Sequence, residues 1–311
     1  MLRSRLQVKN GIKEHIAVLA QELYEQIELP RDGVMVDTTV GHGGHSFLFA
    51  SELGAEGVLI GFDVDEKSIQ SAKARLKDAA CKVILIRENF SQIAGLVRQH
   101  GIEKVDFILA DLGLCSAQIM DEEIGLSFQK EMPLDMRIDK RLTTTAADIV
   151  NRTDEKTLSD IIYNFGEERA SRRIARYIVE QRAKKPLTST IELAAIICRA
   201  LRRPSAKRKS RLHPATRTFQ ALRIVVNDEL ENLKRLLRSV PLLLKQNGYA
   251  AVISYHSLED RLVKLDFRKN AEAGVYKVIT KKPIRPARGE ISENPRARSA
   301  KLRIAERVNR E

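Results

Sequence analysis

The feature that most constrains the fold is an alternation of short apolar runs and longer helical runs between residues 34 and 112. The apolar runs read VMVDTTV, GVLIGFDVD, KVILIRENF and VDFILADLG, and the helical runs include EKSIQSAKARLKDAA and SQIAGLVRQHG. Apolar β-rich runs separated by helical segments are typical of βαβ units, which build a parallel, doubly wound α/β sheet. Ligands of such sheets bind where the strands end.

The pattern changes from about residue 117 to 212, and the change predicts a helical insertion. The runs TLSDIIYNFGEERASRRIARYIVEQR and TIELAAIICRALRR have helical periodicity, with no comparable strand near them. Strand-like sequence returns in GYAAVISYHS and in KLRIAERV. We therefore predict a discontinuous α/β domain over residues 1–116 and 213–311, interrupted by a helical domain over residues 117–212.

The net charge of +13 is unevenly distributed. Residues 1–166 carry 19 Lys and Arg against 26 Asp and Glu, whereas residues 167–211 carry 14 against 4 and residues 261–311 carry 15 against 6. Such asymmetry indicates a polyanionic partner, and nucleic acid fits better than a membrane because the basic blocks lack an aromatic face. We expect phosphate contacts from the cations of the run RRPSAKRKSR, which are Arg202, Arg203, Lys207, Arg208, Lys209 and Arg211.

Cysteine usage and hydropathy bear on the compartment. Three widely separated cysteines form neither a disulfide framework nor a zinc pattern, and no run approaches the roughly 18 apolar residues of a membrane span. We therefore expect a cytoplasmic protein without a membrane partner.

The run VMVDTTVGHGGHS predicts a cofactor loop. Asp37 ends the first strand, glycines such as Gly41 and Gly43 form the turn into a helix from about Ser46, and Asp63 ends the next strand. A carboxylate about 20 residues beyond the glycines is typical of a site for ribose hydroxyls, so an adenosine-containing cofactor follows. NAD remains open on this pattern, but Asp37 would oppose a pyrophosphate and suit a cation, which favours S-adenosylmethionine.

Two structural alternatives compete with this interpretation. Asp63 could instead cap the helix that begins near Glu66. His42 and His45 could be a metal pair, but no Cys or His lies at ligand spacing nearby to complete a zinc site, so we expect no metal.

Several runs together resemble the RsmH (MraW) family, bacterial methyltransferases that modify a cytidine N4 in small-subunit ribosomal RNA. The matching runs are GHGGHS, DLGLCSAQ, PLDMRID, FGEERASRRIARYIV, HPATRTFQALRIVVNDEL, SYHSLEDRLVK and NPRARSAKLRIAER. The resemblance implies a class I (Rossmann-like) S-adenosylmethionine-dependent methyltransferase sheet with an inserted helical domain for RNA recognition. It also implies the small ribosomal subunit and the decoding region of its 16S rRNA as partner, and it leaves a homodimer open.

The resemblance also implies site residues by motif. The S-adenosylmethionine contacts fall on Gly43, Gly44, His45, Asp63, Phe90, Asp111 and Gln118. This chain departs from the family pattern in three places. It has IGLSF at residues 124–128 for the usual RGFSF, Cys115 for the usual serine, and EMPLDM for the usual DGPLDM.

The catalytic step needs an in-line arrangement and a proton acceptor, because the lone pair of cytosine N4 is delocalised into the ring. Amino-group methyltransferases commonly use a (D/N/S)-P-P-(Y/F) turn, but this chain has DLGLCS at that place. We therefore expect the polar atoms to come from Asp111, Ser116 or His256. The aromatic ring that stacks on a flipped base would come from the insertion or from Tyr255.

Three further runs give local expectations. In HPATRTFQALRIVVNDEL, one side of the predicted helix has a polar stripe of Thr216, Gln220, Arg223 and Asn227. This stripe either borders the ligand cleft or is solvated. The candidate RNA contacts of this run are Arg217, Gln220 and Arg223. In SYHSLEDRLVK, Ser257 has capping-box spacing to Asp260 and is expected to cap a helix, and His256 at the strand end keeps both a functional and a structural interpretation. In LDMRID, we expect Asp135, Arg137 and Asp139 to pair with one another.

Overall fold

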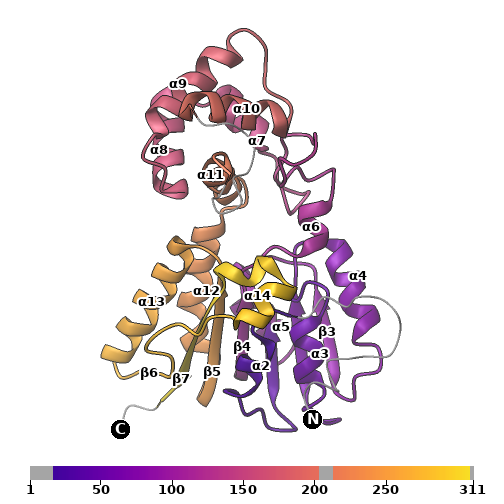
Figure 1. Cartoon of the computed structure of the whole chain (residues 1–311). Helices are drawn as coiled ribbons and strands as arrows, with labels where there is room; N and C mark the ends of the chain where they lie inside the picture. The colour runs from indigo at the N-terminus through magenta and orange to yellow at the C-terminus, as the bar shows by residue number, and fades with distance from the viewer. Residues whose placement is uncertain (1–16, 203–212, 309–311) are drawn as a thin grey trace. The chain divides into compact units, whose positions relative to one another are not determined.

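The computed structural model describes residues 17–202 and 213–308. The chain forms two compact units, one made of Met1–Gly113 with Glu231–Glu311, and one made of Leu114–Leu230. Figure 1 labels the elements of both units. The first boundary lies within three residues of the predicted one. The second lies after residue 230 rather than at 212.

The first unit contains a seven-stranded sheet with strand order β3-β2-β1-β4-β5-β7-β6. Neighbouring strands are parallel from β3 to β5, whereas β7 runs antiparallel to both β5 and β6. The strands are β1 (Val34–Asp37), β2 (Val58–Phe62), β3 (Lys82–Ile86), β4 (Val105–Asp111), β5 (Leu244–Ser254), β6 (Tyr276–Val278) and β7 (Lys301–Arg307). This confirms the predicted doubly wound, Rossmann-like α/β sheet.

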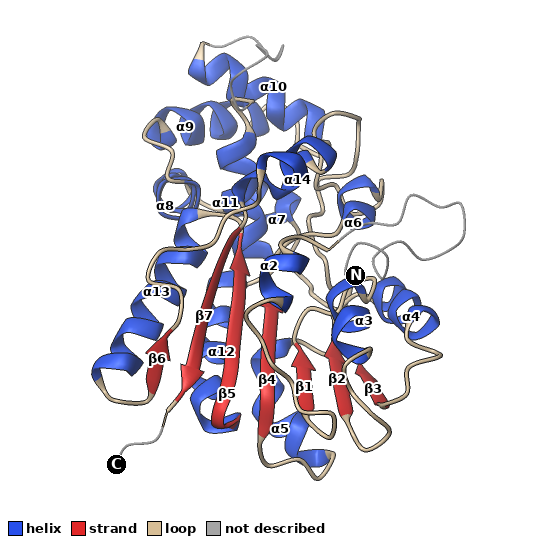
Figure 2. Cartoon of the chain, turned by 60° about the horizontal axis from the view of Figure 1, so that its bottom comes forward, coloured by secondary structure: helices blue, strands red, loops and turns tan. Residues whose placement is uncertain are grey.

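Both faces of the sheet are covered, as the continuous apolar runs of the parallel strands require. Figure 2 shows α2 and α3 in front of the sheet and α12 behind it. The helices of this unit are α2 (Ala20–Tyr24), α3 (Gly44–Ala50), α4 (Glu66–Arg75), α5 (Ile93–Gln99), α12 (Glu229–Leu243), α13 (Ser257–Glu272) and α14 (Arg288–Glu293), with 3-10 turns η1 (Phe90–Gln92) and η2 (Pro295–Ser299). α12 begins two residues before the unit boundary.

Alternating residues of the central strands supply two separate hydrophobic cores, because successive side chains of a strand point to opposite faces. One core joins Val36, Ile60 and Ile108 to buried residues of α5, α12 and α13. The other joins the preceding residues of the same strands, Met35, Leu59 and Phe107, to buried residues of α2, α3 and η2. The sheet is therefore held rigidly on both sides, and its strand ends keep a fixed position.

The second unit is helical, as predicted. Its helices are α6 (Ser116–Met120), α7 (Ala146–Arg152), α8 (Glu155–Gly166), α9 (Ser171–Arg182), α10 (Thr190–Leu201) and α11 (Thr216–Val226). The long helical run of residues 157–182 is divided at Glu167, whose φ of 50° ends α8. Their apolar stripes meet in one core of buried residues that includes Leu158, Ile174, Ile197 and Leu222.

The helix α11 explains why the unit boundary differs from the prediction. Its buried residues Phe219 and Leu222 belong to the helical core. Its backbone comes so close to α8 that a Cβ on Gly166 would lie 2.5 Å from the carbonyl oxygen of Arg217. Helical periodicity identified the buried stripe of this segment but could not tell which unit it packs against.

Among the described residues, no helix is both long enough and apolar enough to cross a membrane. Residues 203–212 lie outside the described residues. The predicted phosphate contacts of Arg203, Lys207, Arg208, Lys209 and Arg211 therefore have no structural description here, whereas Arg202 closes α10 and is exposed.

Candidate active site

The glycine loop connects β1 to α3 at the carboxyl end of the sheet. Gly41 and Gly43 have φ values of 50° and 76°, which glycine adopts without the steric cost of a side chain. Gly43 is the N-terminal cap of α3, and a Cβ on it would lie 3.3 Å from the Cα of Ala72. The helix begins at Gly44, two residues before the predicted start. The loop is therefore a tight turn whose backbone lies close to the strand ends.

Asp63 lies against this loop. Its Oδ2 accepts the N–H of Gly41 at 3.0 Å, and its Oδ1 accepts the N–H of Asp65 at 2.9 Å. Burial raises the pKa of Asp63 to about 6, although the two backbone hydrogen bonds oppose that rise. The expected alternative, that Asp63 caps the following helix, is wrong, because Asp65 accepts the N–H groups of the first turn of α4. The side chain of Asp63 therefore supports the loop.

Asp37 lies beneath the loop and is 1% exposed. Its Oδ2 accepts the hydroxyl of Ser46 at 2.7 Å, and its Oδ1 accepts the N–H of Thr39 at 3.1 Å. Burial raises the pKa of Asp37, the Ser46 hydrogen bond lowers it, and the nearby carboxyl of Asp111 adds to the rise. Asp37 also adds to the rise in the pKa of Asp63. Three carboxyl groups from three strand ends therefore interact at one place, which favours a cationic ligand group and disfavours a pyrophosphate.

His45 and Asp111 face each other beside these carboxyls. Nε2 of His45 lies 3.6 Å from Oδ2 of Asp111, which ends β4. The imidazole is 5% exposed, and neither of its ring nitrogens has a hydrogen-bond partner among the described residues. Buried polar atoms without partners are uncommon and indicate a place where a ligand group can bond. The site therefore fits a polar cofactor.

The two histidines of the loop do not act together. His42 is exposed, whereas His45 is buried. Among the described residues, neither belongs to a group of three side chains that could hold a metal ion. The two histidines therefore lie in different environments, one exposed and one buried.

Tyr255, which follows β5, supplies an aromatic ring to the turn after β4. Burial raises the pKa of its phenol well above 10, and the nearby carboxylate of Asp111 adds to the rise. A Cβ on Gly113 would lie 2.6 Å from the Cε2 of Tyr255, so only glycine leaves room for the ring. The aromatic absent from the DLGLCS turn is thus supplied by a segment about 140 residues later. The glycine in DLG was the only local signal of this packing.

His256 caps α13. Its Nδ1 accepts the N–H of Glu259 at 3.4 Å, while Oε2 of Glu259 accepts the N–H groups of Tyr255 at 2.8 Å and His256 at 3.3 Å. The expectation that Ser257 is the cap is wrong by one residue. Asp260 instead pairs with cations of β7. The spacing from His256 to Glu259 was the signal that we missed.

The remaining cofactor and catalytic candidates lie in two units. Phe90 begins η1 after β3, is half-buried and packs against the core that holds Ile108. Gln118 and Ser116 belong to α6 in the helical unit. The side chain of Gln118 accepts the N–H of Cys115 at 3.1 Å, and the sulfur of Cys115 accepts the N–H of Gln118 at 3.4 Å, so the two form a capping box. Cys115 thus fills the capping role with a weaker acceptor than serine.

The candidate RNA contacts of α11 have partners inside the helical unit. Gln220 donates to the carbonyl of Phe165 at 3.1 Å. Arg223 forms a two-pronged ion pair with Glu229, with N–O distances of 2.7 and 3.1 Å. Arg217 is more accessible, because its side chain is 54% exposed. Gln220 and Arg223 therefore bond to other parts of the helical unit. We expected this polar stripe either to border the cleft or to be solvated, and neither expectation describes these two side chains.

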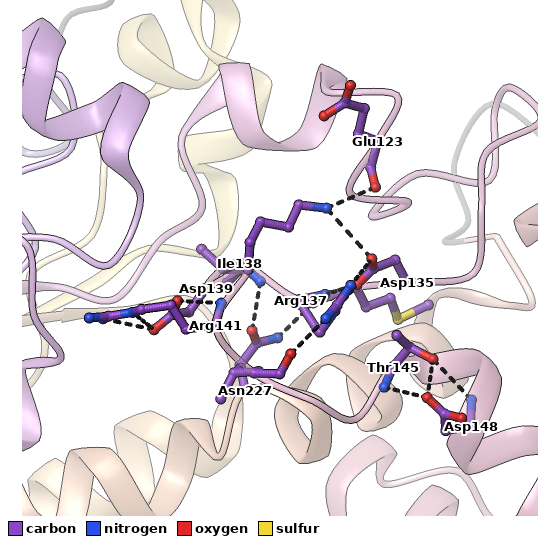
Figure 3. Close-up of polar contacts among 12 residues, drawn as sticks. Glu123, Asp135, Arg137, Ile138, Asp139, Arg141, Thr145, Asp148 and Asn227 are labelled. Atoms are coloured by element: carbon purple, nitrogen blue, oxygen red, sulfur yellow. Dashed lines mark hydrogen bonds and ion pairs between the residues drawn. The ribbon is translucent and has the colours of Figure 1, made fainter.

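The LDMRID segment forms a dense polar network within the helical unit (Figure 3). The guanidinium of Arg137 donates to both oxygens of Asp135, at 2.7 and 2.8 Å, and to the carbonyl of Leu142 at 2.6 Å. Asp139 pairs with Arg141 at 2.9 Å instead. The predicted pairing is thus confirmed for Asp135 and Arg137, and wrong for Asp139.

Asn227 ties α11 to the same segment. Its Oδ1 accepts the N–H of Ile138 at 2.9 Å, and its Nδ2 donates to the carbonyl of Met136 at 2.9 Å (Figure 3). Nearby, Ile124 replaces the arginine usual in the family, is 6% exposed, and accepts the N–H of Met136 through its carbonyl at 2.7 Å. An apolar side chain is therefore compatible with this buried position.

Comparison with known proteins shows the family to which the chain belongs. The sequence model of the MraW methylase family matches residues 12–308. Proteins named ribosomal RNA small subunit methyltransferase H are similar along the whole chain. The one from Koribacter versatilis is 46% identical over 96% of this chain and 96% of its own length, and the one from Geobacter sp. is 43% identical over 94% and 98%. A solved rRNA methylase from Streptococcus thermophilus aligns over 96% of this chain and 100% of that chain, with a TM-score of 0.44 and 12% identity. The match over nearly its full length means that this chain belongs to the MraW methylase family.

Proposed function

We propose that the protein transfers a methyl group from S-adenosylmethionine to the N4 amino group of a cytidine in the decoding region of small-subunit (16S) ribosomal RNA. The observation that carries the proposal is the group of three carboxyls, from Asp37, Asp63 and Asp111, beside a glycine loop with a buried, unpartnered His45. Family membership and the names of the relatives support the reaction and the substrate.

The cofactor would lie across the carboxyl ends of β1, β2 and β4. Asp63 would accept the ribose hydroxyls, because each carboxylate oxygen that already accepts a backbone N–H keeps a second lone pair. Gly43 and Gly44 hold the loop close to Ala72 and Ala17, where added Cβ atoms would lie 3.3 and 3.1 Å from the nearest atoms, and His45 offers unsatisfied ring nitrogens. The clustered acids favour the ammonium and sulfonium groups of S-adenosylmethionine over the pyrophosphate of NAD.

Bound S-adenosylmethionine supplies an electrophilic methyl group, and the residues around Asp111 prepare the acceptor. Asp111 would accept a proton of the amino group and orient its nitrogen toward the methyl. The close contact between the Tyr255 ring and Gly113 keeps the turn after Asp111 in place. The side chain of Ser116 lies outside the part that the structure describes. His256 remains a further candidate for a polar contact to the base, although it already bonds to the first turn of α13.

The helical unit would recognise the RNA. At its surface, the exposed Arg169, Arg172 and Arg173 lie at the start of α9, and Arg202 and Arg217 are also exposed. Since these cations are long and numerous, they fit phosphate contacts that position the substrate without reading its sequence. The partner would be the small ribosomal subunit in the cytoplasm.

The test is transfer of radiolabelled methyl from S-adenosylmethionine to small ribosomal subunits purified from a strain that lacks this enzyme. We expect label in the 16S rRNA, located at a cytidine N4 by mass spectrometry of nucleosides, and its loss in Asp111→Asn. Calorimetry of the wild-type protein with S-adenosylmethionine and with NADH provides a second readout. Binding of NADH alone would assign the site to an oxidoreductase, and absence of transfer with intact RNA binding would indicate a non-catalytic RNA-binding protein.

A further inference from the structure

Four arginines near the carboxyl end of the chain form an unpaired basic surface in the first unit. Arg285, Arg288, Arg296 and Arg298, named here the arginine strip, are all exposed. None of the four guanidinium groups forms an ion pair or a side-chain hydrogen bond with the part of the chain that the structure describes, and the backbone N–H of Arg296 donates to Asn294 at 3.2 Å. Some other exposed cations of this unit, such as Arg87 and Arg268, do lie within 4 Å of a carboxylate.

The strip is held on a rigid support. η2 is anchored by the buried Ala297 between Arg296 and Arg298, and α14, which begins at Arg288, packs against η2. Before α14, Ile284 and Leu302 exchange two backbone hydrogen bonds of 3.0 and 2.9 Å with each other. The four guanidinium groups therefore extend from a fixed backbone, which lowers the entropic cost of binding a ligand.

The strip lies beside the site proposed for methyl transfer. Glu290, two residues after Arg288, accepts the N–H of Leu19 at 2.8 Å. Burial raises the pKa of Glu290, and nearby His45 opposes that rise. The Glu290 carboxyl also interacts with the phenol of Tyr255. Since His45 and Tyr255 flank Asp111, the support of the strip borders the Asp111 turn within a single compact unit.

The charge of the strip identifies its partner. Residues 281–298 carry six Lys and Arg against two Glu, and one of those, Glu290, is bonded to the backbone of Leu19. Guanidinium groups bind phosphates through two parallel hydrogen bonds, and exposed arginines without acidic partners can do so without breaking an existing pair. A nucleotide whose base enters the site must have its flanking phosphates close by.

We propose that the arginine strip binds backbone phosphates of the ribosomal RNA next to the nucleotide that is methylated. The inference deepens the proposed function and depends on it for the identity of the RNA. The proposal assigns part of RNA binding to the first unit, which contains the proposed methyl-transfer site. The charge distribution of the sequence had pointed first to the helical unit.

The test is a salt titration of binding between the full-length protein and 16S rRNA, in the wild type and in R288Q/R296Q/R298Q. Each lost phosphate contact should lower the log–log salt slope by about 0.7 to 0.9, so the triple variant should lose roughly two units and bind at least about tenfold more weakly at low salt. Affinity for the demethylated product of the cofactor should stay unchanged, which also verifies that the variant is folded. If the triple variant does not fold, R288Q and R298Q singly should each show the slope change of one contact.

A matched control removes three cations of the same unit that already have a partner. Lys234, Arg235 and Arg238 are exposed and lie 3.2, 3.9 and 3.3 Å from the carboxylate of Glu231. K234Q/R235Q/R238Q changes the net charge equally and should leave the salt slope close to that of the wild type. Equal slopes for all three proteins would overturn the proposal.

The outcomes separate this inference from the proposed function, because the binding assay requires no methyl transfer. Transfer by the wild type with no slope change in the strip variant would reject the strip alone. A wild type that transfers no methyl would reject the proposed function whatever the slopes are. A defect seen only with assembled subunits, and not with naked rRNA, would assign the strip to an acidic ribosomal protein and overturn the phosphate proposal.

Discussion

Replacing Asp63 with asparagine tests the cofactor site and the electrostatic cost of building it. In the wild type, the carboxylate accepts N–H groups from Gly41 and Asp65, at 3.0 and 2.9 Å, while burial raises its pKa from 3.8 to about 6. Asparagine keeps the shape but removes the charge. It also turns one accepting oxygen into a donating amide, which faces one of the two N–H groups at a cost of about 1–3 kcal/mol.

The raised pKa fixes the sign of the pH dependence. Because the folded protein binds the Asp63 proton more tightly than the unfolded chain, the stabilisation from this group is complete below pH 3.8 and is lost as the pH rises through about 6. A shift of about two units corresponds to roughly 3 kcal/mol, and about 1.4 kcal/mol of it is lost between about pH 5 and 7.5. Asp63→Asn should lack this loss. The unfolding free energy of the variant minus that of the wild type should therefore increase by about 1.4 kcal/mol over that interval.

Cofactor binding should respond in the opposite direction. An ionised Asp63 accepts ribose hydroxyls best, so wild-type affinity should weaken by up to about tenfold for each pH unit below about 6. The variant should bind at least about 1 kcal/mol more weakly at neutral pH and show little pH dependence. Urea unfolding curves and calorimetry with the demethylated product, both over this pH range, measure the two effects. Equal cofactor affinity of variant and wild type at every pH would remove Asp63 from the site.

Three further substitutions test local parts of the structure. Gly125→Ala should destabilise the helical unit by more than about 3 kcal/mol in thermal unfolding. The reason is that Gly125 has a φ of 71° and the new Cβ would lie 1.9 Å from the carbonyl oxygen of Pro133. A melting temperature equal to that of the wild type would contradict this packing. Cys115→Ser should stabilise the same unit by a few tenths to about 1 kcal/mol, because a hydroxyl is a better acceptor at a helix N-cap than a thiol. Lower stability of the variant would show that the sulfur contributes by apolar packing and not by capping α6. Tyr255→Phe keeps the ring and removes the hydroxyl that interacts with Asp111, so kcat should fall while the KM for S-adenosylmethionine changes little. An unchanged kcat would separate Tyr255 from catalysis.

Local sequence patterns predicted the parallel α/β sheet and the helical insertion, but not the strand order or the short strand β6. The β-rich runs ending at Asp37, Asp63 and Asp111 placed three carboxyls at strand ends, and parallel strands bring such ends to one edge. Glycines between Asp37 and the first helix indicated the tight turn. These features depend on backbone conformation and on periodic burial, which neighbouring residues largely determine.

The partners of the polar side chains were decided only by tertiary packing. Asp63 bonds to Gly41 across 22 residues, and Tyr255 reaches Asp111 across 144 residues. The polar stripe of α11 was visible in the sequence, but the ion pair of Arg223 with Glu229 was not. A helical or strand period fixes which face a side chain occupies, whereas its partner depends on which distant segment packs against that face. The sequence by itself therefore determined the sheet, the helical insertion and the glycine turn after β1, and only the folded chain brought His45, Asp111, Tyr255 and the support of the arginine strip together.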